Sequence, residues 1–152
     1  MKRNIQVVQE LYEAFANKDT GLLRRLLHSE VEWIQCEGFP GGDKRRGVDE
    51  VLDKVIGGLR SEWNGFRADV EEFLDSGGNI VVLGRYSGTH AVSGKSMSAV
   101  FAHVYDVNDG QVTRFRQFAD TQPIVAASQP SPETDLACVG HSGEGFRGRK
   151  QP

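Results

Sequence analysis

The chain has 152 residues, of which 26% are charged, and its formal net charge at pH 7 is −3. This length suits one domain with a buried core. The slightly acidic balance argues against binding to nucleic acids or anionic membranes, because both require a basic surface. No apolar run is long enough to span a membrane and no signal-peptide pattern is seen, so we expect a cytoplasmic protein.

The first part of the chain is predicted to be mainly helical. Apolar residues recur at helical spacing over residues 7–15, 22–27 and 48–59. Asp19 can cap the second of these helices, because a short polar side chain before a helix accepts from its first free N–H groups. A short strand, residues 31–34, is expected between the second and third helices.

The second part is predicted to form antiparallel strands over residues 67–74, 80–89, 97–107 and 111–121, separated by glycine-containing turns. The order of helices, one strand, a helix and four strands indicates an α+β fold with helices on one side of a curved sheet.

Proline, glycine, serine and charged residues dominate the C-terminal segment from Gln129 onward, and hydrophobic periodicity disappears there. A segment of this composition cannot bury enough apolar surface to offset the entropy of ordering it. We therefore predict a domain over residues 1–128 and a flexible tail over 129–152.

The last two predicted strands carry the chemistry, and their turn decides which side chains share a face. Asn108, Asp109 and Gly110 suit a three-residue loop that places Val107 opposite Gln111. A two-residue turn would shift the register by one and move one strand's side chains to the other face. In the favoured register Arg114, Arg116 and Phe118 point to one face, beside Val100, Ala102, Val104 and Asp120. The opposite, mostly apolar face carries His103 and Gln117 together with Met97, Ala99, Phe101, Tyr105, Thr113, Phe115, Ala119 and Thr121.

Three segments carry a family resemblance: VQELYEAFANKD at residues 8–19, GTH at 88–90 and DGQVTRFRQFADT at 109–121. With the order of elements, they resemble the nuclear-transport-factor-2-like superfamily, in particular its SnoaL-like and ketosteroid-isomerase-like family. The resemblance implies a conical α+β barrel, in which a strongly curved antiparallel sheet wraps around three N-terminal helices and leaves an apolar pocket. It also implies a homodimer that pairs through the outer face of the sheet.

His103 is the first catalytic candidate, because a pocket histidine with a near-neutral pKa can exchange a proton. In SnoaL-like cyclases the matching histidine neighbours an aspartate on the last strand, where this chain has Gln117, which cannot take a proton. Asp120 is the nearest carboxylate and becomes a base only if a bulge turns it inward; otherwise it caps the strand end or pairs with an arginine. Glu37, in the loop after the first strand, is the alternative acid. His103 itself has a structural alternative, in which a backbone carbonyl or Gln117 fixes the ring.

The candidates for contacting a substrate come from several predicted elements. Tyr12 lies on the first helix, and its hydroxyl needs a partner if it is buried. The other candidates, each of which can equally be ordinary core or surface, are Gln117, Trp33, Gln35, Phe39, Arg85, Tyr86, His90, Met97, Phe101 and Phe115.

No metal site or cofactor site is expected. The four histidines are widely spaced, and no helix carries a two-histidine motif. The sequence therefore favours a cofactor-free isomerase, cyclase or dehydratase that acts on an apolar carbonyl or polycyclic compound by acid/base catalysis. Two alternatives stay open: a non-catalytic pocket for a small hydrophobic molecule, and a dimerisation module of the same fold.

Overall fold

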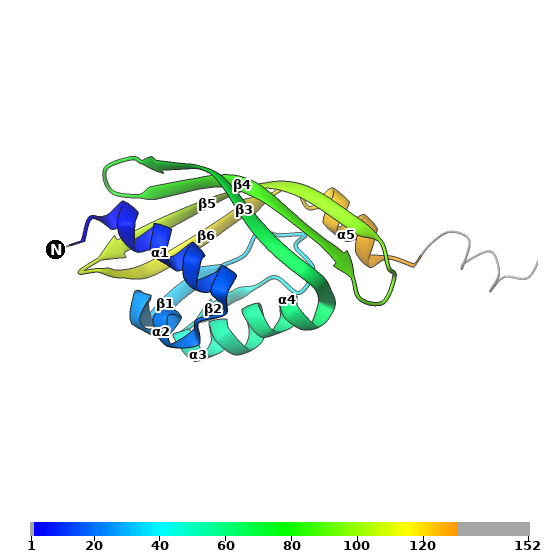
Figure 1. The fold of residues 1–152 in the computed structure, drawn as a ribbon, viewed down its shortest axis with the longest axis horizontal. Helices are drawn as coiled ribbons and strands as arrows, with labels where there is room; N and C mark the ends of the chain where they lie inside the picture. Colours follow the sequence, from blue (N-terminus) through cyan, green and yellow to red (C-terminus); the bar gives the residue numbers. More distant parts are fainter. Residues whose placement is uncertain (1, 131–152) are drawn as a thin grey trace, which may run out of the picture.

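The computed structural model describes residues 2–130, so most of the predicted tail, residues 131–152, lies outside the described residues. Figure 1 shows the helices of residues 4–62 gathered on one side of a bent sheet, with the short C-terminal helix apart from them near the sheet's far end. The elements in chain order are α1 (Asn4–Asn17), α2 (Thr20–Leu26), β1 (Leu27–Ile34), β2 (Lys44–Arg46), α3 (Val48–Glu50), the π-helical segment η1 (Val51–Ile56), α4 (Gly57–Glu62), β3 (Trp63–Asp75), β4 (Ile80–His90), β5 (Ser96–Asn108), β6 (Gln111–Ala119) and α5 (Gln122–Ser128).

The three predicted N-terminal helical regions are confirmed. α1 turns Val7, Val8 and Leu11 into the core, and all three are fully buried. The carboxylate of Asp19 accepts a hydrogen bond from the backbone N–H of Leu22 at 3.1 Å, which caps α2 as expected.

The third helical region is one run through α3, η1 and α4. Its two glycines do not end it, because Gly57 keeps helical backbone angles (φ −60°, ψ −41°) and the run continues to Glu62. Each glycine inside a helix costs about 1 kcal/mol relative to alanine. The burial of Val51 and Val55 against the core opposes that cost.

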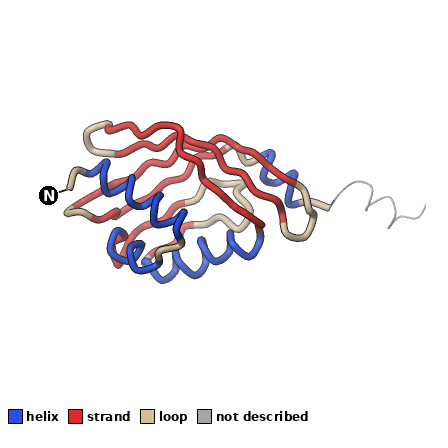
Figure 2. Tube along the Cα trace, viewed as in Figure 1, coloured by secondary structure: helices blue, strands red, loops and turns tan. Residues whose placement is uncertain are grey.

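The strands form one mixed sheet in the order β2-β1-β6-β5-β4-β3. Figure 2 shows the strands in red and the helices in blue. The α+β class and the curved sheet around the helices are confirmed. All neighbours are antiparallel except β1 and β6, which run parallel. β2 and α5 were not predicted, although Pro123 in the first turn of α5 is a typical helix-start signal.

The predicted loop of the last hairpin is wrong, but the predicted faces of its central residues are confirmed. Asn108 pairs with Gln111, so the turn has two residues, and both Asp109 and Gly110 have positive φ (52° and 79°). Such a turn matches the twist of the two strands. On its own it would move one strand's side chains to the other face.

A β-bulge corrects that shift a few residues further along the hairpin. Val107 pairs with Val112, whereas the next pair is Asp106 with Arg114, so Thr113 is the extra residue. Beyond it, His103 pairs with Gln117 on the inner face. Thr113, predicted to face inward, instead bonds Asn108 and the Asp106 carbonyl, and Val112 takes the inner position.

The backbone of β4 is closely approached by β3 and by the Phe101 ring at Gly84. A Cβ at this residue would lie 2.3 Å from the Asp69 carbonyl oxygen and 2.6 Å from Cζ of Phe101. Only glycine allows the Phe101 ring to lie across β4 at this point.

Among the helices of residues 2–130, none has the length and apolar character needed to cross a bilayer.

Candidate functional site

The His103 side chain lies between two tyrosine hydroxyl groups. Its Nδ1 is 2.5 Å from the hydroxyl oxygen of Tyr12 on α1, and its Nε2 is 2.5 Å from that of Tyr86 on β4. Both ring nitrogens are therefore taken by neutral phenols. His103 is 4% exposed, so this pairing is shielded from solvent.

The hydrogen-bonded chain extends beyond the two tyrosines in both directions. On one side, the Tyr105 hydroxyl donates to the Tyr12 oxygen at 2.8 Å. On the other, Nε2 of Gln117 donates to the Tyr86 oxygen at 2.9 Å. The Gln117 Oε1 accepts from the backbone N–H of Cys36 at 3.2 Å and from its thiol at 3.4 Å. We call this set, Tyr105–Tyr12–His103–Tyr86–Gln117–Cys36, the polar chain.

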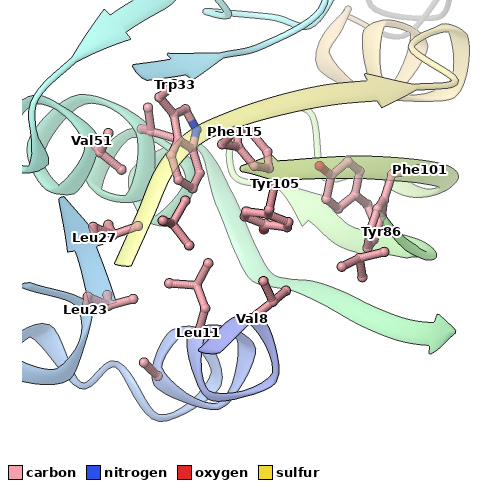
Figure 3. Close-up of a cluster of buried hydrophobic side chains, with 14 of the residues drawn as sticks. Val8, Leu11, Leu23, Leu27, Trp33, Val51, Tyr86, Phe101, Tyr105 and Phe115 are labelled. Carbon is pink, nitrogen blue, oxygen red and sulfur yellow. The ribbon is translucent and has the colours of Figure 1, made fainter. Parts of the chain in front are cut away.

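Aromatic rings surround the polar chain. The imidazole stacks on Phe101 at a centroid distance of 4.1 Å and meets Phe115 edge-on at 4.8 Å. The Tyr86 ring also stacks on Phe101, with the two ring centroids 4.4 Å apart. Figure 3 shows the rings of Tyr86, Phe101 and Phe115 along the inner face of the sheet, with Val8 of α1 opposite them. Side chains of three strands and one helix thus enclose the ring.

Burial sets the protonation states of the polar chain. It lowers the pKa of His103 from its usual 6.5 to about 3, because the interior disfavours the charged imidazolium. The same desolvation raises the pKa of Tyr12, Tyr86 and Tyr105 well above their ordinary value near 10. At neutral pH His103 and the three tyrosines are therefore uncharged.

An uncharged chain of this kind can orient a hydrogen bond and pass a proton between neighbours without creating a lasting charge. A phenol held by an amide and an imidazole is a preorganised donor for a carbonyl or enolate oxygen. Proton abstraction from carbon needs a base, and no aspartate or glutamate is among the buried residues of the described part of the chain.

The structure does not bring the two predicted carboxylates to His103. Asp120 is exposed, and its carboxylate accepts from the backbone N–H of Gln122 at 3.4 Å, at the start of α5. Glu37 is also exposed, but it lies in the loop between β1 and β2, directly after Cys36.

Two further predicted residues lie away from the polar chain. Arg85 is exposed on the outer face of β4, where it donates to the Ser98 hydroxyl at 3.1 Å. His90 is buried at the end of β4, packs edge-on against Trp63 and accepts from the backbone N–H of Ser93 at 3.2 Å. This arrangement holds the turn before β5.

Of the remaining predicted residues, three contact the His103 ring and the others lie near them on the inner face or in the β1–β2 loop. Phe101, Phe115 and Tyr86 contact the His103 ring, as described above. Trp33 stacks on Phe115 at 3.9 Å, and its Nε1 has no hydrogen-bond partner. Phe39 reaches Tyr86 from the β1–β2 loop, with ring centroids 6.2 Å apart. Met97 is buried on the same strand as His103, and Gln35 is half-buried at the base of the loop.

A hollow of about 540 Å³ opens elsewhere, on the surface between α2 and η1. It is lined by Thr20, Arg24, Asp49, Glu50, Leu52 and Asp53. A salt bridge of 2.8 Å between Arg24 and Asp49 crosses it, and both side chains are solvent-exposed. None of its lining residues belongs to the polar chain.

Tyr105 and Cys36 were not predicted as members of the site. Tyr105 lies two residues after His103 on one strand, so its inward direction was evident, but its link to Tyr12 depends on how α1 packs on the sheet. Cys36 joins through its backbone N–H as well as its thiol, and a backbone contact has no signature in the sequence.

Comparisons with known proteins identify relatives of this architecture. The family model for the SnoaL-like domain matches residues 8–115. An NTF2-like protein from Burkholderia thailandensis is 33% identical, covers 86% of this chain and 100% of its own, and superposes with a TM-score of 0.82.

More distant structures share the fold alone. A Jannaschia protein assigned to the SnoaL-like polyketide cyclases is 20% identical, covering 86% of this chain and 99% of its own, with a TM-score of 0.73. TerC, co-crystallised with polyporic acid, is 23% identical and covers 82% of this chain and 97% of its own, also with a TM-score of 0.73. No curated protein sequence matches the chain significantly.

Proposed function

Because the chain belongs to the SnoaL-like family of NTF2-like proteins, we propose that it is a cofactor-free isomerase, cyclase or dehydratase. Its substrate is an apolar carbonyl or polycyclic compound. The observation that carries the proposal is the Tyr86 hydroxyl, held by Gln117 and His103 inside a wall of aromatic rings. Two neighbours of the same fold support a small organic ligand: one is assigned to the SnoaL-like polyketide cyclases, and the other was co-crystallised with polyporic acid.

The Tyr86 hydroxyl is the proposed contact for the substrate oxygen. Isomerisation, ring closure and dehydration of carbonyl compounds share an enol or enolate stage, in which negative charge develops on oxygen. A fixed donor in a dry site stabilises that charge more than water does. Phe39, Phe66 and Phe101 border Tyr86 and offer apolar surface to the rest of such a substrate.

Access to Tyr86 would come from the β1–β2 loop, which carries both Cys36 and Phe39 to the polar chain. Displacing the Phe39 ring would open a path to the hydroxyl. The same loop carries Glu37, so we assign the base to Glu37 rather than to Asp120, whose carboxylate is engaged at the start of α5.

The first experiment measures binding and turnover with a panel of enones, epoxides and polyketide-like compounds. Binding to the native state raises its thermal stability, so a shift in melting temperature identifies ligands. For any ligand that is turned over, Tyr86→Phe should lower kcat/KM by about 10²–10³-fold, the usual effect of losing one oxyanion donor. Arg85→Gln, a change on the outer face of the same strand, is the control and should leave turnover unchanged.

The second experiment assigns the proton transfers. His103→Gln should lower turnover by about 10²–10⁴-fold if the imidazole exchanges a proton with the substrate or with Tyr86. Glu37→Gln should cause a loss of the same order, and Asp120→Asn should not. Turnover that survives Tyr86→Phe and His103→Gln together would refute the proposed site.

A non-catalytic binding pocket is the second candidate, and the absence of a buried carboxylate from residues 2–130 favours it. Native mass spectrometry of the purified protein distinguishes the two. A bound hydrophobic molecule released chemically unchanged supports a binding function, whereas conversion of an added ligand supports the enzyme.

We also propose that the chain forms a homodimer through the outer face of the sheet. Val100 and Phe118 are 47% and 53% exposed there, a large apolar surface for side chains on neighbouring strands. Charged residues around them suit a partly polar interface. Phe118→Glu should convert a dimer into a monomer in sedimentation analysis, and a monomeric wild-type protein at micromolar concentration would refute the proposal.

A further inference from the structure

From Tyr105 to Gln117 the polar chain has four contacts, but five hydrogens compete for them: three hydroxyl hydrogens, the imidazole hydrogen and the amide hydrogen that Gln117 donates. One of these five is therefore unused. Two of the donors are fixed. The fully buried Tyr105 hydroxyl donates to Tyr12, and Gln117 donates to Tyr86 because its Oε1 faces the backbone N–H of Cys36. The remaining freedom is the tautomer of the neutral His103, in which one ring nitrogen carries a hydrogen and the other accepts.

The two tautomers leave the spare hydrogen in different places. With the hydrogen on Nδ1, Tyr86 donates to Nε2, and the Tyr12 oxygen accepts from both Nδ1 and Tyr105. The Tyr12 hydrogen is then unused. With the hydrogen on Nε2, Tyr12 donates to Nδ1, and the Tyr86 oxygen accepts from both Nε2 and Gln117. The Tyr86 hydrogen is then unused and free for a ligand.

On the premise of the proposed function, we propose that His103 is a tautomeric switch that makes Tyr86 a donor for a carbonyl oxygen. Ligand binding selects the tautomer with the hydrogen on Nε2. Tyr12 and Tyr105 are positioning residues: they touch no substrate, but the run of donors from Tyr105 through Tyr12 to Nδ1 favours that tautomer.

Tyr105 and Gln117, at opposite ends of this part of the polar chain, favour opposite tautomers of His103. Successive hydrogen bonds in one direction polarise and strengthen one another. Tyr105, donating to Tyr12, strengthens the Tyr12 bond to Nδ1 and moves the imidazole hydrogen to Nε2. Gln117, donating to Tyr86, strengthens the Tyr86 bond to Nε2 and moves the hydrogen to Nδ1.

The switch also defines the ligand class. In the tautomer with the hydrogen on Nε2, the Tyr86 oxygen already accepts two hydrogen bonds, so the hydroxyl can only donate. A neutral carbonyl or an enolate oxygen meets that requirement. An ammonium group, which can only donate, does not, and it would leave two donors facing each other in an apolar site.

The test on the free protein uses ¹⁵N-labelled histidine and long-range ¹H–¹⁵N spectra, which distinguish the protonated from the accepting ring nitrogen. We compare Tyr105→Phe with Gln117→Met, which remove the opposing donors. The fraction of His103 with the hydrogen on Nε2 should be lower in Tyr105→Phe than in Gln117→Met. Equal fractions, or the reverse order, would overturn the switch, whereas a purely structural role for Tyr105 predicts no difference.

The test with a ligand uses cyclohex-2-enone as the probe and cyclohexylamine as the matched control, in the Tyr105→Phe protein. The enone should raise the Nε2-protonated fraction, and the amine should not. Binding of the enone at Tyr86 without a change of tautomer would overturn this inference and leave the proposed function standing. No binding at Tyr86, with the free-protein order as expected, would refute the proposed carbonyl site instead.

Discussion

The two faces of β5 and β6 place polar groups under opposite conditions. On the inner face, His103 and Gln117 are buried among rings and are satisfied by neutral hydroxyl and amide groups. On the outer face, Arg114 lies near Glu32 and Asp106, and all three side chains are partly exposed to solvent. The inner face therefore holds its polar groups without net charge, whereas the outer face tolerates charge because water solvates it.

This difference explains why the inner face is the functional candidate. A neutral donor in a dry interior keeps its strength because no water competes for it and no ion screens it. The partly exposed charges of the outer face are screened and suit recognition by a second protein surface. The following changes test the contrast between the two faces.

The largest expected effect is the pH dependence of stability from His103. Its pKa is about 3 in the folded protein and near 6.5 when unfolded, so between these values only the unfolded chain binds the proton. Stability is therefore fully present above pH 6.5 and falls as the pH drops toward 3, by roughly 5 kcal/mol over the whole interval. The groups facing the ring, Tyr12 and Tyr86, do not titrate in this range.

The measurement is urea unfolding at several pH values between 4.5 and 7.5, for the wild type and for His103→Gln. The variant lacks the titrating ring, so the stability difference between the two proteins should shrink as the pH falls. If the unfolding free energies of the two proteins changed with pH in parallel, His103 would be accessible to protons in the native state, contrary to its enclosure by aromatic rings.

A second effect tests the close approach of β3 and Phe101 to Gly84. Gly84→Ala would place its new methyl 2.3 Å from the Asp69 carbonyl oxygen, so the backbone of β3 or the Phe101 ring must move. We expect a loss of about 1–3 kcal/mol in unfolding free energy. Gly88→Ala on the same strand is the control, because its nearest contact, Phe66 Cα at 3.4 Å, is ordinary. Equal stability of the two variants would contradict the close approach of Phe101 to β4.

A third, smaller effect isolates one bond of the polar chain. Tyr105→Phe removes the hydroxyl that donates to Tyr12, but Tyr12 keeps its contact with His103, so no buried group is left without a partner. The expected loss is about 1 kcal/mol, the net worth of one neutral hydrogen bond. Denaturant unfolding measures this loss. A loss above about 3 kcal/mol would indicate that the other hydrogen bonds of the polar chain also break when the Tyr105 hydroxyl is removed.

The sequence predicts the inner face better than it predicts the turn that sets it. Alternation in the strands placed His103 and Gln117 together, and this is correct although the loop was assigned one residue too many. The bulge at Thr113 restores the two-residue period, because burying the apolar face outweighs the ideal ladder near the turn. Strand alternation therefore predicts which face these side chains occupy even when the turn length is misjudged.

The partners of His103 could not be predicted in the same way. Tyr12 is 91 residues away along the chain and reaches the ring only because α1 packs across the sheet. The parallel pairing of β1 with β6 is equally remote in sequence. Periodicity reports which way a side chain points, but it does not report which element lies opposite.

The smallest effect is expected on the outer face, where Arg114→Ala removes both ion pairs at once. The Arg114 Nε lies 3.7 Å from the Glu32 carboxylate and a terminal nitrogen lies 3.9 Å from Asp106, distances too long for hydrogen bonds. Because the three side chains are each 29–39% exposed, solvent screens the pairs, and we expect a change below about 1 kcal/mol. The change should shrink further in 1 M salt, whereas the effect of Tyr105→Phe should not. If Arg114→Ala lowers the unfolding free energy more than Tyr105→Phe does at high salt, the charged groups of the outer face are shielded from water in solution, as they would be inside a dimer interface. The contrast between the two faces then holds only for the isolated chain.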